Sequence, residues 1–268
     1  MTWSLIAHTS AAGNNSTATT TPAIDTTGAD LIVIIGTYYG PGGGAISDSK
    51  SSTWPATVLT AQSSNSFNKT VLSFVQAPAV GSGHTFTIST PGTQVASLLV
   101  EAWSGSVASP LDQTNNTQTD NVASIQPGSI TPGSGNELII TGTGWGMAAP
   151  TTVSVDSGFT QPDAFVAWTN NVNYGASMSY LVQGAAAAVN PTWSYSPSVD
   201  SGVVIASFTG AAAATSVPER GKMGVGSWLA PGVGDAALTA AGLRWAAEKL
   251  KNNGVISRRG LFIPSRRR

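Results

Sequence analysis

The sequence predicts an all-β protein: a two-sheet antiparallel sandwich of jelly-roll type, built from two related halves and followed by an extended C-terminal arm with one short α-helix. Three observations lead to this fold class. Short runs of Val, Ile, Thr and Phe alternate with Gly, Ser, Asn and Pro up to about residue 210. Four segments recur at a nearly constant spacing, and the charge changes sign at residue 211.

The short apolar runs are typical of strands in a sandwich or barrel, because turn residues separate them at regular intervals. Residues 84–89 alternate strictly, so that Phe86 and Ile88 share one face of a strand. No helical period precedes residue 211, and without crossover helices the sheets should be mainly antiparallel. The clearest expected strands are Leu31–Ile35, Val71–Val75, Thr85–Ser89, Ser97–Trp103, Glu137–Thr141, Ser177–Val182 and Val203–Phe208.

The repeat divides the body, residues 1–210, into related halves at about 20–105 and 125–210. Its four matches are 28–36 with 135–142, Asp48 with Asp156, 72–75 with 178–181, and 102–105 with 207–210. We expect each half to pack one apolar face against the other. Two separate tandem sandwiches are the alternative, although residues 104–125 look like a polar crossover.

The C-terminal arm, residues 211–268, differs from the body in charge and pattern. The body holds two cations and ten anions, a net charge of −8, whereas the arm holds ten cations and three anions, a net charge of +7. A helix is expected at about 235–252, capped by Asp235 and ended by Asn253-Gly254. We expect the arm to dock through apolar and basic side chains, namely Trp228, Leu238, Trp245, Leu250, Leu261, Phe262, Arg258, Arg259, Arg266, Arg267 and Arg268.

The search for chemistry predicts no catalytic residue, no metal site and no cofactor. The chain has no cysteine and two histidines, of which His84 is interpreted as a turn or strand residue. The glycine-rich stretch 142–146 is interpreted as a hairpin or bulge, because it lacks the spacing of a dinucleotide loop. Asp48 and Asp156 fit Asx-turns, with a calcium site as the alternative.

Residues 24–33, 47–54, 80–86 and 103–105 carry a resemblance. Together they are similar to β-sandwich domains of phage virion structural proteins, of the capsid decoration or cement type, and of uncharacterised bacterial proteins, and the similarity covers roughly residues 20–210. Its motifs are turns and strands, so it implies a fold and a virion setting but no active site. The arm resembles, in kind only, the segments by which decoration and connector proteins bind their neighbours.

We therefore expect a non-enzymatic virion protein, assembled in the host cytoplasm, whose sandwich faces outwards and whose arm docks on the major capsid protein or another virion protein. A homotrimer is expected, since closed symmetry suits a particle surface. No membrane partner is expected, and nucleic acid is the less favoured partner of the arginines. The alternative is a carbohydrate-binding module for host attachment, with Tyr38, Tyr39, Trp145 and Trp168 stacking on sugars or else buried; a hydrolase assembled from distant loops is the remaining class.

Residues 1–210 should fold without the arm, because the apolar periodicity ends at Phe208. Circular dichroism of this truncated chain should give a β-type spectrum with a cooperative thermal transition. A collapsed or helical spectrum would place the boundary elsewhere.

Overall fold

The computed structural model describes residues 2–13, 17–40, 44–55, 58–65, 68–90, 96–156, 158–168 and 172–211. Within these ranges the protein is all-β with antiparallel sheets, as predicted, and contains no helix that could cross a membrane. Apart from Ala211, the arm lies outside the described residues, including the helix expected at 235–252 and the docking residues named for it.

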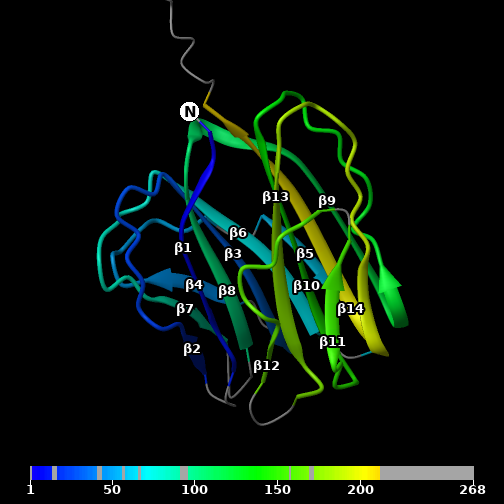
Figure 1. The fold of residues 1–268 in the computed structure, drawn as a ribbon. Helices are drawn as coiled ribbons and strands as arrows, with labels where there is room; N and C mark the ends of the chain where they lie inside the picture. The colour runs from blue at the N-terminus through cyan, green and yellow to red at the C-terminus, as the bar shows by residue number, and fades with distance from the viewer. Residues whose placement is uncertain are drawn as a thin grey trace, which may run out of the picture. The chain divides into compact units, whose positions relative to one another are not determined.

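Two large sheets and one small sheet make up the body (Figure 1). The first large sheet has the order β1-β8-β3-β6-β5, with bounds Ser4–Ala11, Ala96–Ser104, Leu31–Tyr39, Asn68–Gln76 and Leu59–Gln62. The second has the order β11-β14-β10-β13-β12, with bounds Thr152–Val155, Trp193–Gly210, Glu137–Gly146, Gly175–Gln183 and Val166–Ala167, and β9 (Ser106–Ile125) also pairs with β14. The small sheet has the order β2-β7-β4, with bounds Ala18–Thr20, Phe86–Ser89 and Ala45–Asp48.

The two halves of the chain have the same topology. If β9 is taken as the counterpart of β1, the order β1-β8-β3-β6-β5 in the first half corresponds to β9-β14-β10-β13-β12 in the second half. Segments that match in sequence lie on corresponding strands, such as β3 with β10 and β6 with β13. Even the isolated bridge between Ile24 and His84 has a counterpart between Ile130 and Val189.

A shared core joins the two large sheets. Alternate residues of β3 and β8 meet alternate residues of β10 and β14 in one buried cluster, which includes Leu31, Val33, Ile35, Leu99, Trp103, Leu138, Ile140, Val204, Ala206 and Phe208. Phe74 and Phe208 pack edge to face across it at 5.2 Å between ring centroids. The halves therefore pack on each other through one face of each large sheet.

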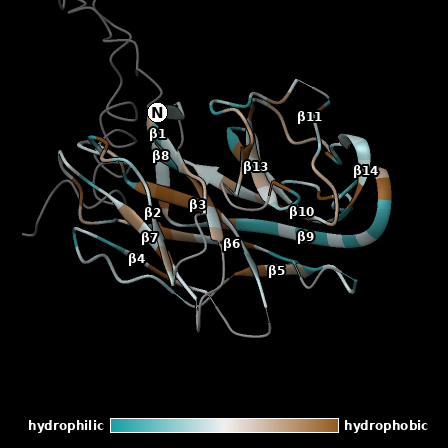
Figure 2. Ribbon diagram, turned by 90° about the horizontal axis from the view of Figure 1, so that it is seen from below, coloured by the Kyte–Doolittle hydropathy of each residue, from teal (hydrophilic) through white to brown (hydrophobic). Residues whose placement is uncertain are grey.

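The opposite face of each large sheet is also buried. Ile32, Ile34 and Val100 pack under the small sheet against Phe86 and Ile88. In the second half, β11 and the first residues of β14 cover the corresponding face through a cluster around Trp145, Trp193 and Tyr195. Figure 2 shows the resulting succession of layers, from β4 and β7 on one side to β11 on the other. Each half therefore has a second packed layer of its own, whereas the sequence predicts one pair of sheets for the whole body.

Two local expectations are wrong. Residues 106–125 form the 20-residue strand β9 rather than a crossover. Its hydrogen bonds come from β14 while most of its side chains stay solvated, so a polar sequence is compatible with a strand there. The glycine-rich stretch 142–146 lies inside β10 in regular register rather than in a hairpin or bulge, because side chains of the first sheet, such as Ile35 and Thr70, occupy the space that a Cβ at Gly142 or Gly144 would need.

The start, middle and end of the body meet at one point. The Ala211 N–H donates to the Gly105 carbonyl at 2.7 Å, and the Gly105 Cα lies close to the backbone of Trp3. The Trp3 indole and the Gly210 N–H both donate to the carbonyl oxygen of Asn136 at 3.0 Å. We call this place the junction end, and the far end of β10 the loop end.

Gly142→Ala should destabilise the protein by about 1–3 kcal/mol, because the new Cβ overpacks the core. It would lie 2.5–2.6 Å from side-chain atoms of the buried Ile35. The free energy of urea unfolding measures the effect. Gly184→Ala is the matched control, since a Cβ there meets nothing within 4 Å, and it should stay within about 0.5 kcal/mol of wild type. Equal effects at both positions would contradict the close approach of the sheets.

Candidate functional site

The loop end brings together polar and aromatic side chains from both halves. At the end of β10, Gly146 pairs with Asp200 on one side, while Trp145 pairs with Gly175 on the other. Asp200 and Tyr174 therefore flank the last residues of the same strand. Asp120 of β9 accepts a hydrogen bond from the Ser63 hydroxyl at 2.8 Å, which fixes the β5–β6 turn of the first half beside the second half.

A cavity of about 380 Å³ opens at this end. Its polar lining consists of Asn65 from the first half and Asn121, Ser198 and Asp200 from the second. Met147, Ala148 and Val199 give it an apolar wall. The volume is within the range of roughly 300–1,000 Å³ typical of small-molecule sites.

Asp200 is the buried acid of this cavity. It is 4% exposed, and its Oδ1 accepts the backbone N–H of Asn121 at 2.8 Å. Its Oδ2 has no hydrogen-bond partner among the described residues. The φ angles of Asn121 and Met147 are 54° and 71°, so the lining backbone is in the left-handed region at two residues other than glycine. Polar groups left without partners in a strained loop are found at functional sites more than elsewhere.

The four aromatic residues expected at a glycan site have different positions. Trp145, Trp168 and Tyr38 are 0%, 1% and 5% exposed, so their ring faces are covered by protein. They are core residues, which is the alternative to sugar stacking that the sequence left open. Tyr39 is 36% exposed and packs edge to face on Tyr174 at 5.6 Å between centroids.

Tyr174 connects these rings with the cavity. It stacks on Trp168 at 4.7 Å. Its pKa is raised by burial first and then by Tyr39 and the nearby charge of Asp200. Tyr39 and Tyr174 therefore place partly exposed aromatic side chains at the loop end.

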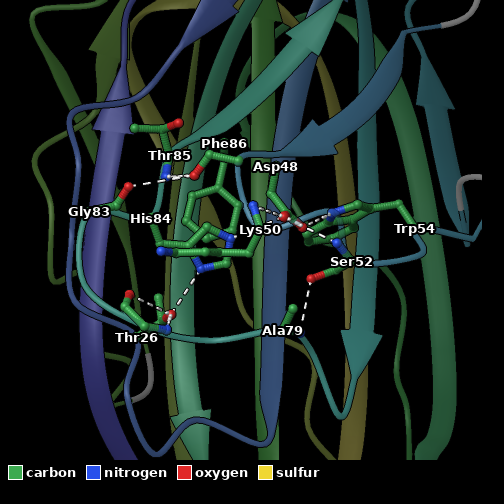
Figure 3. A network of polar contacts seen from close by, with 12 residues as sticks. Thr26, Asp48, Lys50, Ser52, Trp54, Ala79, Gly83, His84, Thr85 and Phe86 are labelled. Atoms are coloured by element: carbon green, nitrogen blue, oxygen red, sulfur yellow. Dashed lines mark hydrogen bonds and ion pairs between the residues drawn. The ribbon is translucent and has the colours of Figure 1, made fainter.

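A second polar cluster holds the small sheet in place (Figure 3). Asp48, at the end of β4, accepts the N–H groups of Lys50 and Ser52 through Oδ1 at 2.8 and 3.2 Å, and the Trp54 indole through Oδ2 at 2.6 Å. This is the Asx-turn predicted from the sequence. Burial alone would raise the pKa of Asp48, but these donors outweigh it and hold the pKa below its usual value.

His84 lies between Asp48 and Thr26. Its Nε2 is 3.2 Å from the Asp48 carboxylate without good hydrogen-bond alignment, and its Nδ1 is 2.9 Å from the Thr26 hydroxyl. The order hydroxyl, imidazole, carboxylate is that of a hydrolytic triad. The side chains of His84 and Asp48 are 0% exposed, however, as is Thr26, and Phe86 stacks on the imidazole, so the hydroxyl is closed to a substrate. Burial lowers the pKa of His84, against the opposing effect of Asp48, and the cluster serves as a structural connection between loops.

Glu101 is a further buried acid, in the interface between the large sheets. Its Oε2 accepts the Trp103 indole at 3.0 Å, and its Oε1 has no partner among the described residues. Burial raises the pKa of Glu101 to about 8, and Asp163 adds to the effect. His8, opposite Glu101 on β1, lies 3.1 Å from Asp163.

Within the described ranges, no three acidic or histidine side chains are grouped as a metal site requires. Asp156, considered for calcium, instead accepts the Thr192 N–H at 2.7 Å. No protein-family model, curated protein or solved structure matches the chain. Nothing in the sequence singles out Asp200, Glu101 or Tyr174. The repeat, which aligns the ends of β3 and β10, is the one signal that places Tyr39 and the residues after Trp145 at the same end.

Glu101→Gln should remove part of the pH dependence of stability. In the unfolded chain this carboxyl loses its proton above its ordinary pKa of 4.5, whereas the folded protein keeps it up to about pH 8. Between these values the folded state binds more protons, so a rise in pH costs stability, on the order of 1 kcal/mol per pH unit. Chemical unfolding of wild type and variant from pH 5 to pH 8 measures it.

The neutral amide keeps an acceptor for Trp103. The free energy of unfolding of the variant should therefore rise relative to that of wild type as the pH rises. Asp25→Asn, at an exposed carboxyl, is the control for the change of charge. A difference between Glu101→Gln and wild type that stays constant with pH would contradict a protonated Glu101.

Proposed function

We propose that this protein is a structural virion protein, of the capsid decoration, cement or head–tail accessory type. Its body faces outwards as a jelly-roll-like sandwich, and its arm docks on the major capsid protein or another virion protein. A homotrimer is the proposed assembly, which native mass spectrometry of the full chain can check.

The supporting observation is that the described chain enters and leaves the body at the same end. Trp3 and Ala211, where the chain enters and leaves the described body, both lie at the junction end. The cavity of Asp200 lies beyond the other end of β10, whose 10 residues span about 30 Å. Attachment through the junction end would leave the loop end of the body free to face outwards.

The charge division supports the same proposal. The arm carries a net charge of +7 and the body −8, so the two parts suit different surroundings. Apolar side chains occur between the basic ones in the arm, among them Trp245 and Phe262. Docking on protein uses both kinds of side chain, whereas phosphate binding uses mainly the cations.

Phe262→Ala and Trp245→Ala should weaken particle attachment more than any single Arg→Ala change among residues 258–268. Each buried anchor contributes roughly 1.5–3 kcal/mol, whereas an exposed ion pair contributes under ~1 kcal/mol. The measurement is the fraction of each variant that co-sediments with particles assembled in its presence, and cryo-EM of these particles should show the body on their surface.

Attachment should also survive nuclease and moderately raised salt. Release by salt with a steep logarithmic slope, together with competition by free DNA, would make the arm a nucleic-acid binder. Absence of the body from every particle map would reject the virion proposal itself.

Carbohydrate binding for host attachment is a second candidate, favoured by the cavity and the exposed Tyr39 at the loop end. A glycan array probed with the full chain tests it. The two functions are compatible, because one uses the arm and the other uses the loop end of the body.

A further inference from the structure

We propose that the loop-end cavity binds a neutral saccharide, and that Asp200 accepts hydrogen bonds from two neighbouring hydroxyl groups of the sugar. The inference rests on the carbohydrate-binding candidate and specifies its site and ligand class. It is independent of the virion proposal.

The shape and chemistry of the lining favour a sugar ring. Asp200 supplies a carboxylate to the lining, with Oδ2 buried and without a donor among the described residues, and the side-chain amides of Asn65 and Asn121 each carry a donor and an acceptor. Vicinal hydroxyls can donate to a carboxylate and accept from such amides. Met147 and Val199 provide an apolar surface for the C–H face of the ring.

The charges of the site exclude an anionic ligand. Asp200 is the one charged side chain in the described lining, and it is negative. The body contains two cations in its sequence, Lys50 and Lys69. Lys69 lies over the Tyr38 ring, 5.6 Å from its centroid, and Lys50 lies beside Gly81. Among the described residues, a phosphate, sulfate or sialic acid group would therefore meet a carboxylate without a compensating positive charge.

The position of Asp200 also favours discrimination between sugars. A buried acceptor rejects an analogue that lacks the matching hydroxyl, because the acceptor is then left without a partner in the complex. Asn121 holds Asp200 through its backbone N–H at 2.8 Å, so the carboxylate is already oriented before a ligand binds. Asn65 comes from the other half of the chain, so the site requires both halves.

The test is titration of the full chain with methyl glycosides of neutral hexoses and with N-acetylglucosamine, followed by NMR or calorimetry. Wild type should bind at least one of them with a Kd of about 1 mM or tighter. Asp200→Asn and Asn65→Ala should each weaken binding, the first by about tenfold or more, since a charged acceptor is lost. Asp25→Asn is the matched control, because it removes the same charge from an exposed aspartate far along the chain, and it should bind as wild type does.

Thermal unfolding of each variant separates loss of binding from loss of fold, and Asn65, an exposed turn residue, keeps the test valid if Asp200→Asn fails to fold. Saccharide binding that neither variant weakens would overturn the inference and leave the carbohydrate-binding candidate standing. Absence of binding to every neutral saccharide on the array would overturn both. Binding of calcium alone at Asp200, with no response to sugars, would overturn the inference in favour of a cation site.

Discussion

The burial of β3 and β10 on both faces is the constraint on which the rest of the body depends. One face of each strand contributes to the core shared by the two halves, and the other face contributes to the core of its own half. Leu31 to Ile35 are all 0% exposed. Since neither strand has a face for solvent, a substitution on either one disturbs two clusters, and the halves cannot separate without exposing the shared core.

The sequence predicted the strands and the repeat, but not the number of layers. A strand with one buried face alternates apolar and polar residues, whereas 31–35 is a continuous apolar run, which is the pattern of a strand covered on both sides. The residues that form β9 are polar, and this composition fits an edge strand as well as a crossover between the halves. Pairing with β14 decides between them, and pairing is not visible in the residues of β9 alone.

The candidate site was harder to predict, because residues far apart in the chain form it. Tyr39 was found from its type and its place near a turn, yet the same reasoning selected Trp145 and Trp168, which the structure buries. Asp48 was assigned correctly to a turn, since its donors follow within a few residues. Asp200 could not be recognised, because its burial and its free oxygen depend on loops from strands β9, β10 and β14.

The meeting of Trp3, Gly105 and Ala211 at one place explains how such a protein could arise and how it could be rearranged. A unit whose two ends adjoin can be copied in tandem without a linker, because the second copy begins where the first one finishes. Asp30 and Glu137 occupy equivalent places in the repeat beside this point, where Asp30 accepts the Gly105 N–H and Glu137 accepts the Thr209 hydroxyl. The order of the two copies along the chain then matters little to the folded state. The body is therefore suited to circular permutation, with new termini at Gly105 and the ends near Trp3 and Ala211 joined.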